Sequence, residues 1–185
     1  MNTTPDDREA LDPLLVRTAL HDESAFAELY RRTSARLFGI CLRMLPDRAE
    51  AEDALQEVFV AVWRRAQSYD PALGSAMTWL VTITRNRTID RLRQSGDRSR
   101  RDLIDLDRLP DEGRGPSAAT EASEEYRLLQ LCLDQLEVNH RRSVREAFFS
   151  GATYKEMAER CQVPLGTMKS WIRRALIQLR ACLES

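Results

Sequence analysis

Side chains that could bind nucleic acid are concentrated between residues 76 and 101, where seven arginines stand against two aspartates. Trp79, Ile83, Asn86, Asp90 and Arg93 recur there at helical spacing, so they would form one stripe along a helix. An indole can stack on an unpaired base, an amide can read a base edge, and arginines can hold phosphates. The stripe predicts a surface for single-stranded nucleic acid. The competing interpretation is that Trp79 lies in the core and the arginines only cover it.

A second basic surface is predicted for residues 165–183. On a helical wheel, one arc of about 100° carries the apolar side chains Met168, Ile172, Ala175, Leu176, Leu179 and Leu183. The opposite side carries hydroxyl and basic side chains: Thr167, Ser170, Arg173 and Arg174, with Lys169 at its edge. Arginine can bond guanine O6 and N7 together, while hydroxyls and lysine can hold phosphate. A plain amphipathic helix with a solvated basic face is the alternative.

The segment before that helix has the pattern of a helix-turn-helix motif. Thr153 and Glu156 have the spacing of a capping box, which predicts a short helix over 153–161. Only residues 162–164 separate it from the next helix, and Ala158 is small enough for a close crossing. This arrangement favours insertion of the second helix into the major groove of duplex DNA.

Residues 48–67 carry a different surface. The start of this predicted helix is acidic, since only Arg48 opposes Asp47, Glu50, Glu52, Asp53 and Glu57. Acidic side chains at a helix N-terminus interact favourably with the macrodipole, which alone could explain the pattern. However, polar and apolar groups stand side by side outside the inward stripe, at Gln56, Glu57, Phe59, Val60 and Trp63. That mixture indicates a protein-binding surface.

These surfaces require helices on both sides of a linker. Apolar side chains recur with helical period over 8–20, 24–45, 48–67 and 75–95, and again over 124–136, 139–150, 153–161 and 165–183. No stretch alternates as a half-buried strand would. Residues 96–123 contain three glycines, two prolines and charges of both signs, as a flexible tether does. The sequence thus predicts an all-α protein with small domains at 1–95 and 124–185.

Composition limits the classes of protein that fit. The 185 residues allow one domain or two small ones, and 43% hydrophobic residues suffice for a core. A formal net charge of −1 argues against indiscriminate binding to nucleic acid. The charge is uneven, however: −1 over residues 1–95, −4 over 96–125 and +4 over 126–185. Neither a membrane span nor a signal peptide is evident, so we expect a cytoplasmic protein.

Metal binding and catalysis find little support in the sequence. The four cysteines include no Cys-x-x-Cys pair, and the two histidines, His21 and His140, are far apart. A zinc ribbon and a Ser-His-Asp triad are therefore not expected. We find no phosphate-binding loop either, and so we expect neither an enzyme nor a cofactor.

Four motifs, in this order, resemble those of the bacterial extracytoplasmic-function (ECF) sigma factors. They are AFAELY at 25–30, AEDALQEVF at 51–59, TWL…RNRTIDRL at 78–92, and YKEMA…GTMKS…RAL at 154–176. The resemblance covers nearly the whole chain, and within the family it is greatest to the group containing the actinobacterial SigK proteins. It implies a region 2 domain, a linker and a region 4 domain.

The resemblance assigns roles to the surfaces. Region 2 would dock on the clamp helices of the RNA polymerase β′ subunit through Asp53, Gln56, Glu57 and Phe59. The helix over 75–95 and the turn over 69–75 would open the −10 element and capture a flipped base. Asn86 is the candidate for base contact, Trp79 would support or stack, and the strand would be held by Arg85, Arg91 and Arg93. Region 4 would read the −35 element as duplex through Thr167, Lys169, Ser170, Arg173 and Arg174.

The resemblance also implies partners. Besides promoter DNA, these are core RNA polymerase, through its β′ clamp helices and β flap, and an anti-sigma factor, which is often membrane-anchored. No small-molecule substrate is implied. The acidic linker could imitate nucleic acid in the polymerase channel or could serve only as a tether.

Four residues fit this scheme less simply. Trp171 stands where the family often has arginine, and could meet phosphate, pack or contact a partner. Asp90 puts a negative charge on the DNA-facing stripe, where it could orient an arginine. A disulfide between Cys132 and Cys182 could tune anti-sigma binding if their Cα atoms come within about 7 Å. The simpler alternative is buried free cysteines in a reduced cytosol.

The residues alone also fit other classes of protein. A helix-turn-helix repressor or activator, binding duplex DNA as a dimer, would explain residues 124–185 but leave 24–95 without a role. A protein-only interaction module is a further alternative. Promoter-specific transcription by core polymerase separates a sigma factor from both.

Overall fold

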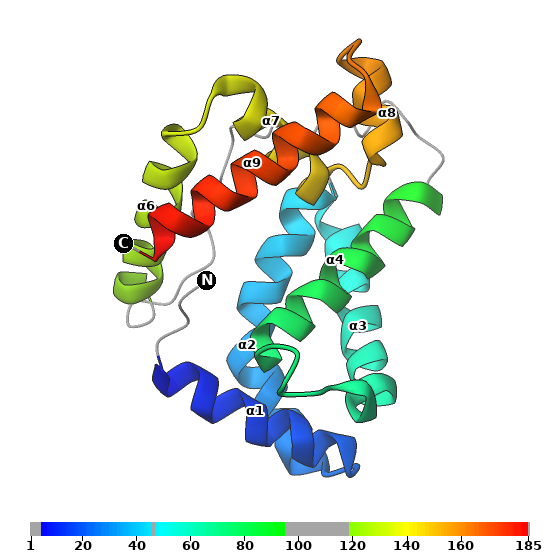
Figure 1. The fold of residues 1–185 in the computed structure, drawn as a ribbon. Helices are drawn as coiled ribbons and strands as arrows, with labels where there is room; N and C mark the ends of the chain where they lie inside the picture. The colour runs from blue at the N-terminus through cyan, green and yellow to red at the C-terminus, as the bar shows by residue number, and fades with distance from the viewer. Residues whose placement is uncertain (1–4, 46, 95–118, 185) are drawn as a thin grey trace. The chain divides into compact units, whose positions relative to one another are not determined.

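The computed structural model describes residues 5–45, 47–94 and 119–184, with side chains described from residue 11 in the first range and from residue 127 in the last. Every regular element in these ranges is helical, which confirms the all-α prediction (Figure 1). The described helices divide into two compact units. One contains α1 to α4, and the other contains α6 to α9.

The first unit is a helical bundle. Its helices are α1 (Pro5–Ala19), α2 (Glu23–Met44), α3 (Arg48–Arg65) and α4 (Ala76–Gln94), with a 3₁₀ turn at Ala66–Ser68. Because aliphatic positions recur every three or four residues, each helix turns one face inward. The inward faces meet in a core that includes the buried side chains Leu15, Leu29, Leu37, Val58, Val62 and Leu80.

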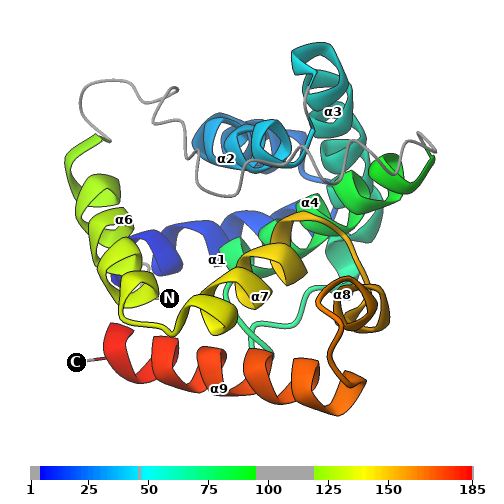
Figure 2. The same cartoon turned by 90° about the horizontal axis from the view of Figure 1, so that it is seen from above.

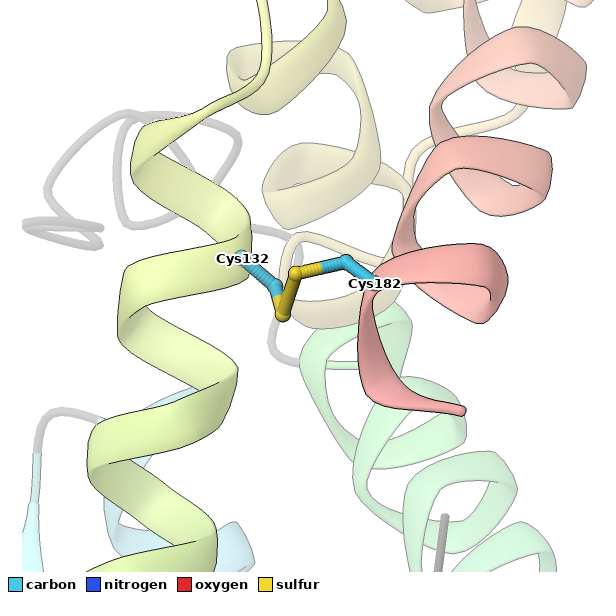
Figure 3. Close-up of a disulfide and its surroundings, with 2 residues drawn as sticks. All are labelled: Cys132 and Cys182. Atoms are coloured by element: carbon cyan, nitrogen blue, oxygen red, sulfur yellow. A yellow bond between two sulfur atoms is a disulfide. The ribbon is translucent and has the colours of Figure 1, made fainter. Parts of the chain in front are cut away.

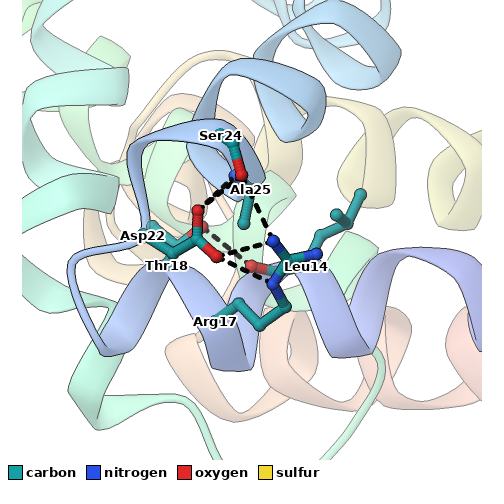
Figure 4. Close-up of polar contacts among 6 residues, drawn as sticks. All are labelled: Leu14, Arg17, Thr18, Asp22, Ser24 and Ala25. Carbon is teal, nitrogen blue, oxygen red and sulfur yellow. Dashed lines mark hydrogen bonds and ion pairs between the residues drawn. The ribbon is translucent and has the colours of Figure 1, made fainter.

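A polar network fixes the turn between α1 and α2 (Figure 4). The backbone of His21 is left-handed, with φ of 61°, and Asp22 caps α2 by accepting from the Ala25 N–H at 3.0 Å. The Arg17 guanidinium donates to the other Asp22 oxygen at 2.9 and 2.6 Å. Hydrogen bonds from the Ser24 hydroxyl, the Ala25 N–H and Arg17 hold the pKa of the Asp22 carboxyl well below its usual range. The network thereby ties the end of α1 to the start of α2.

The second unit is arranged around its last helix. It consists of α6 (Ala119–Asp134), α7 (Val138–Phe149), α8 (Tyr154–Arg160) and α9 (Leu165–Leu183). α9 packs against the other three helices. In Figure 2 they meet it at successive places, with α8 near its N-terminal end and α6 near its C-terminal end. One core cluster lies where α6 meets α9, and another lies where α8 meets α9. Met168 and Ile172 of α9 are buried in the second of these clusters.

The predicted helix, turn and helix of the motif are all present in α8 and α9. Thr153 and Glu156 form the capping box, because the Glu156 N–H donates to the Thr153 hydroxyl at 3.2 Å and the Thr153 N–H donates to the Glu156 carboxylate at 2.8 Å. Gln162 then takes φ of 53°, and the Val163 N–H reaches the Ala158 carbonyl at 3.0 Å. This turn directs the chain into α9.

The start of α6 differs from the prediction. The helix begins at Ala119, five residues before the predicted start at residue 124. The added residues, 119–123, include two alanines and one glutamate, which favour helix without adding the apolar period used to set the boundary. The last part of the predicted linker is therefore helical. The rest of it, 96–118, lies outside the described residues.

The inward face of α9 also differs from the prediction at one position. Leu176, which we expected in the core, is 52% exposed, whereas Ala175 and Leu179 are buried. The reason is that α6 packs on the side of α9 that carries Cys182, so the buried face of α9 is centred away from Leu176.

A disulfide joins the first and last helices of the second unit (Figure 3). The Cα atoms of Cys132 in α6 and Cys182 in α9 are 5.8 Å apart. The bond lies beside the buried side chains Leu133 and Leu179. Of the other cysteines, Cys41 is a buried free thiol whose pKa is raised by burial, and Cys161 is free and half-buried.

Candidate nucleic-acid and protein interfaces

α4 presents its predicted polar stripe only in part. Asn86, Asp90 and Arg93 are exposed, but Ile83 is buried in the core. The half-buried Trp79 ring packs against the core and lies edge-on to Tyr69, with the ring centroids 6.0 Å apart. The accessible part of α4 that could meet nucleic acid therefore begins at Asn86, with Trp79 packed beside the preceding turn.

Arg91 points from α4 toward α3. Its guanidinium donates to the Glu57 carboxylate at 2.7 Å and to the Asp53 carboxylate at 2.9 Å. Only 24% of the Arg91 side chain is exposed, against 61% for Asp53 and 56% for Glu57. The pairing joins two carboxylates predicted to face a protein with an arginine predicted to face DNA. Spacing could not reveal it, because the partners are 34 and 38 residues apart. Arg85, the neighbour predicted to hold the same strand, is half-buried.

The predicted protein-binding surface lies along one side of α3. Asp53, Gln56 and Glu57 are exposed there and line a groove of about 460 Å³ that Arg64 and Arg87 also line. Carboxylates and guanidinium groups thus share one open groove between α3 and α4.

Phe59 lies elsewhere than the other three residues predicted for that surface. It is 4% exposed, and its ring packs against Tyr30 and Phe26, with centroids 4.5 and 6.1 Å away. In this structure Phe59 packs α3 against α2 and offers no surface to a partner.

The turn before α4 is held at several points. The Tyr69 hydroxyl donates to the Gly74 carbonyl at 3.2 Å, and the Ala72 N–H donates to the Asp70 carboxylate at 2.9 Å. Between these contacts, the Leu73 side chain is 87% exposed. An exposed leucine at the tip of an anchored turn is well placed to meet a partner or a base.

α9 turns its polar face to solvent. Lys169, Arg173 and Arg174 are exposed, and Thr167 and Ser170 are half-buried. Four of the five predicted residues, Thr167, Ser170, Arg173 and Arg174, therefore follow the first half of the helix on the side away from the buried Met168, with Lys169 at the edge of that side. Such a face can enter the major groove with its basic side chains toward bases and phosphates.

Trp171 packs within the second unit. Its ring lies against the α8–α9 cluster, and its centroid is 6.3 Å from that of His140. Of the roles considered for Trp171, the structure shows packing. Asp90 lies on the exposed side of α4 and lines a shallow pocket with Arg87, Arg91 and Arg93.

The part of the chain with a described structure holds no cluster of three or more His, Cys, Asp or Glu side chains that could bind a metal ion. None of its helices combines the length and apolar character needed to cross a bilayer.

Comparison with known families matches both units. Residues 29–98 match the Sigma-70 region 2 family, and residues 126–179 match the Sigma-70 region 4 family. The chain is 38% identical over 178 residues to the ECF RNA polymerase sigma factor SigK of Mycobacterium tuberculosis, covering 94% of each protein. The chain belongs to the ECF sigma factors. As a sigma factor it directs RNA polymerase to promoters and is not itself an enzyme.

Other sigma factors show similar degrees of likeness. SigK of Mycobacterium ulcerans is 35% identical over the full length of both chains, and SigK of Mycolicibacterium vanbaalenii is 37% identical over 94% of this chain and 89% of its own. Among solved structures, Rhodobacter sphaeroides SigE in complex with the anti-sigma ChrR is 32% identical, covering 90% of this chain and 94% of that one, with a TM-score of 0.44.

Proposed function

We propose that the two units of this sigma factor divide promoter recognition between them. Residues 1–95 act as region 2, residues 124–185 act as region 4, and residues 96–123 connect them. The observation that carries the proposal is the polar face of α9, on which Lys169, Arg173 and Arg174 are exposed. The opposite face of α9 is buried, and the helix follows the capped α8 and a tight turn.

Region 4 then reads the −35 element as duplex DNA. Arg173 and Arg174 supply the charged donors for base edges and phosphates, and Lys169, Thr167 and Ser170 hold the backbone. The net charge of +4 over residues 126–185 favours this contact electrostatically.

Region 2 docks on the β′ clamp helices through the exposed side of α3. Asp53, Gln56 and Glu57 make the contact, and Phe59 contributes by packing beneath them. Two accessible carboxylates beside arginines suit a partner surface that itself carries basic and polar groups.

The accessible part of α4 and the turn at 69–75 capture the melted −10 strand. Asn86 offers an amide to a base edge, Trp79 supports the turn, and Arg85 and Arg93 hold the strand. Arg91 is turned toward α3 by its hydrogen bonds to Asp53 and Glu57, so it joins them when those bonds are released.

We also propose that an anti-sigma factor regulates this protein, as the resemblance implies, by covering the polymerase-facing surfaces. In this scheme region 4 contacts the β flap as well as DNA. The Cys132–Cys182 disulfide, which ties α6 to α9, is then in a position to alter anti-sigma binding when it is reduced.

Transcription in vitro tests the proposal. Core RNA polymerase with this protein should initiate from specific promoters, and Arg173→Ala with Arg174→Ala should lower initiation where a −35 element is needed. Each base contact is worth about 1–3 kcal/mol, so we expect a loss of tenfold or more. Arg180→Ala is the matched control, because Arg180 lies on the same helix but pairs with Glu184 at 2.8 Å. Failure to initiate from any promoter, with tight binding of free dimeric protein to duplex DNA, would instead favour a helix-turn-helix repressor or activator.

A further inference from the structure

Asp12 of α1 makes a long-range contact with the first residue of α4. Its carboxylate oxygen Oδ1 accepts a hydrogen bond from the Ala76 N–H at 2.7 Å, across 64 residues of sequence. Ser75 completes the cap, since its hydroxyl accepts from the Thr78 N–H at 3.3 Å. The start of α4 is thus held by the residue that precedes it and by one residue of a distant helix.

This contact is physically well suited to fixing a helix. The first N–H groups of an α-helix have no partner within it, and Asp12 satisfies one of them. A carboxylate at that end also interacts favourably with the helix macrodipole. Asp12 is partly buried, so its bond to Ala76 is less exposed to competing water.

The same carboxylate is near the turn that precedes α4. Tyr69, which begins this turn, closes it by donating to the Gly74 carbonyl at 3.2 Å. Burial and the neighbouring Asp12 carboxylate together raise the pKa of Tyr69. Gly74 takes φ of 154°, which a residue with a side chain adopts with strain. Asp12 therefore stands where the turn ends and the helix starts.

α1 lies outside the residues that match the Sigma-70 region 2 family, which begin at Leu29. The exposed Asn86 lies on α4, whose N-terminus Asp12 fixes, and the exposed Leu73 lies in the turn that Tyr69 closes. A helix outside the matched region thus fixes the start of α4, and its Asp12 carboxylate neighbours Tyr69, which closes the turn.

We propose that Asp12 is a positioning residue for −10 recognition, holding the turn at 69–75 and the start of α4 in the geometry that receives the flipped base. This inference rests on the proposed function. It assigns α1 a part in promoter selectivity without contact between α1 and DNA.

The test uses full-length protein bound to core polymerase and forked promoter DNA with a single-stranded −10 element. The measured quantity is the ratio of affinities for the cognate base and for a substituted base at the flipped position. Asp12→Ala should lower this ratio about fivefold to tenfold, as loss of a helix cap and loop anchor allows, and leave the affinity for core polymerase unchanged. Asp12→Asn keeps an oxygen acceptor for the Ala76 N–H and should retain most of the ratio.

Two further variants separate positioning from general stability. Thr18→Val removes a partly buried hydrogen bond within α1, from the Thr18 hydroxyl to the Leu14 carbonyl at 2.8 Å, and should lower the Tm without changing the ratio. Tyr69→Phe removes the hydrogen bond that closes the turn and should also lower the ratio. This variant keeps the inference testable if Asp12→Ala does not fold.

An unchanged ratio in Asp12→Ala would overturn the inference, and so would an equal fall in Thr18→Val. If Asp12→Ala is unfolded, an unchanged ratio in Tyr69→Phe would do the same. Absence of polymerase-dependent promoter binding by the unsubstituted protein is a separate outcome, because it would remove the proposed function itself.

Discussion

At the scale of single residues, Arg91 connects the two proposed surfaces of region 2. Its guanidinium contacts Asp53 and Glu57, so all three charges are partly neutralised before a partner arrives. A clamp helix that takes these carboxylates would leave Arg91 without its acceptors and available to a phosphate. Polymerase docking and strand binding would then be coupled through one side chain.

A double-mutant cycle measures this pairing. In urea unfolding, Arg91→Ala and Asp53→Asn should show a coupling free energy of about 0.5–1 kcal/mol, since the acids are more than half exposed but Arg91 is not. The matched control is Arg48 with Glu52 on α3, an exposed pair at 2.9 Å that should couple more weakly. Equal coupling in the two cycles would show that Arg91 is only another surface ion pair.

At the scale of elements, local capping defines the helix-turn-helix. Thr153 and Glu156 satisfy each other's backbone N–H groups at the start of α8, and that short helix has little else to set its beginning. Because α8 supports α9 through Met157 and Ala158, the cap acts on the recognition face indirectly.

Thr153→Ala should therefore destabilise the second unit by about 1 kcal/mol and weaken −35 binding, with no effect on the first unit. Hydrogen exchange of α9 amides reports the loss. The reciprocal control is Asp47→Ala, which removes the cap of α3, where Asp47 accepts from the Glu50 N–H at 3.0 Å. Loss of protection in both units from either change would contradict this assignment.

The disulfide between α6 and α9 makes a second prediction at this scale. It closes a loop with a sequence separation of 50 residues, so loop entropy gives it about 4 kcal/mol at most. Reduction should speed hydrogen exchange in α6 and α9, whereas a Cys132→Ser, Cys182→Ser protein should not respond to reductant. Four titratable thiols in protein handled in air would show that the bond does not form.

At the scale of the whole molecule, the net charge differs between region 2, the linker and region 4. Residues 1–95 carry −1, residues 96–125 carry −4 and residues 126–185 carry +4, so the basic region 4 is offset by the rest of the chain. Non-specific affinity for DNA depends on uncompensated positive charge. The division favours a protein that reaches promoters only as part of the polymerase.

Free protein should consequently bind a duplex −35 element only weakly, with a Kd above about 10⁻⁶ M at physiological salt. Fluorescence anisotropy with and without core polymerase checks this, and binding by the complex should be far tighter. Tight, sequence-specific binding by the free chain would contradict the prediction and favour a repressor.

The helices were largely predictable because their signals are local. The capping box at Thr153 and the apolar period of α9 identify the motif from a few adjacent residues. The contacts of Asp12 with Ala76 and of Arg91 with Asp53 were not, since they depend on how helices meet after folding. Leu176 was misplaced for the same reason: a wheel gives the apolar arc, but the neighbouring helix decides which part of it is covered.

The bond between Cys132 and Cys182 has a topological consequence. The turn before α8, α8 itself and α9 as far as Cys182 lie inside the covalent loop that it closes. A protease that cuts once within the loop leaves two fragments that stay one molecule until a reductant arrives. A single cut in this loop can therefore break the backbone of region 4 but cannot release part of it from the protein.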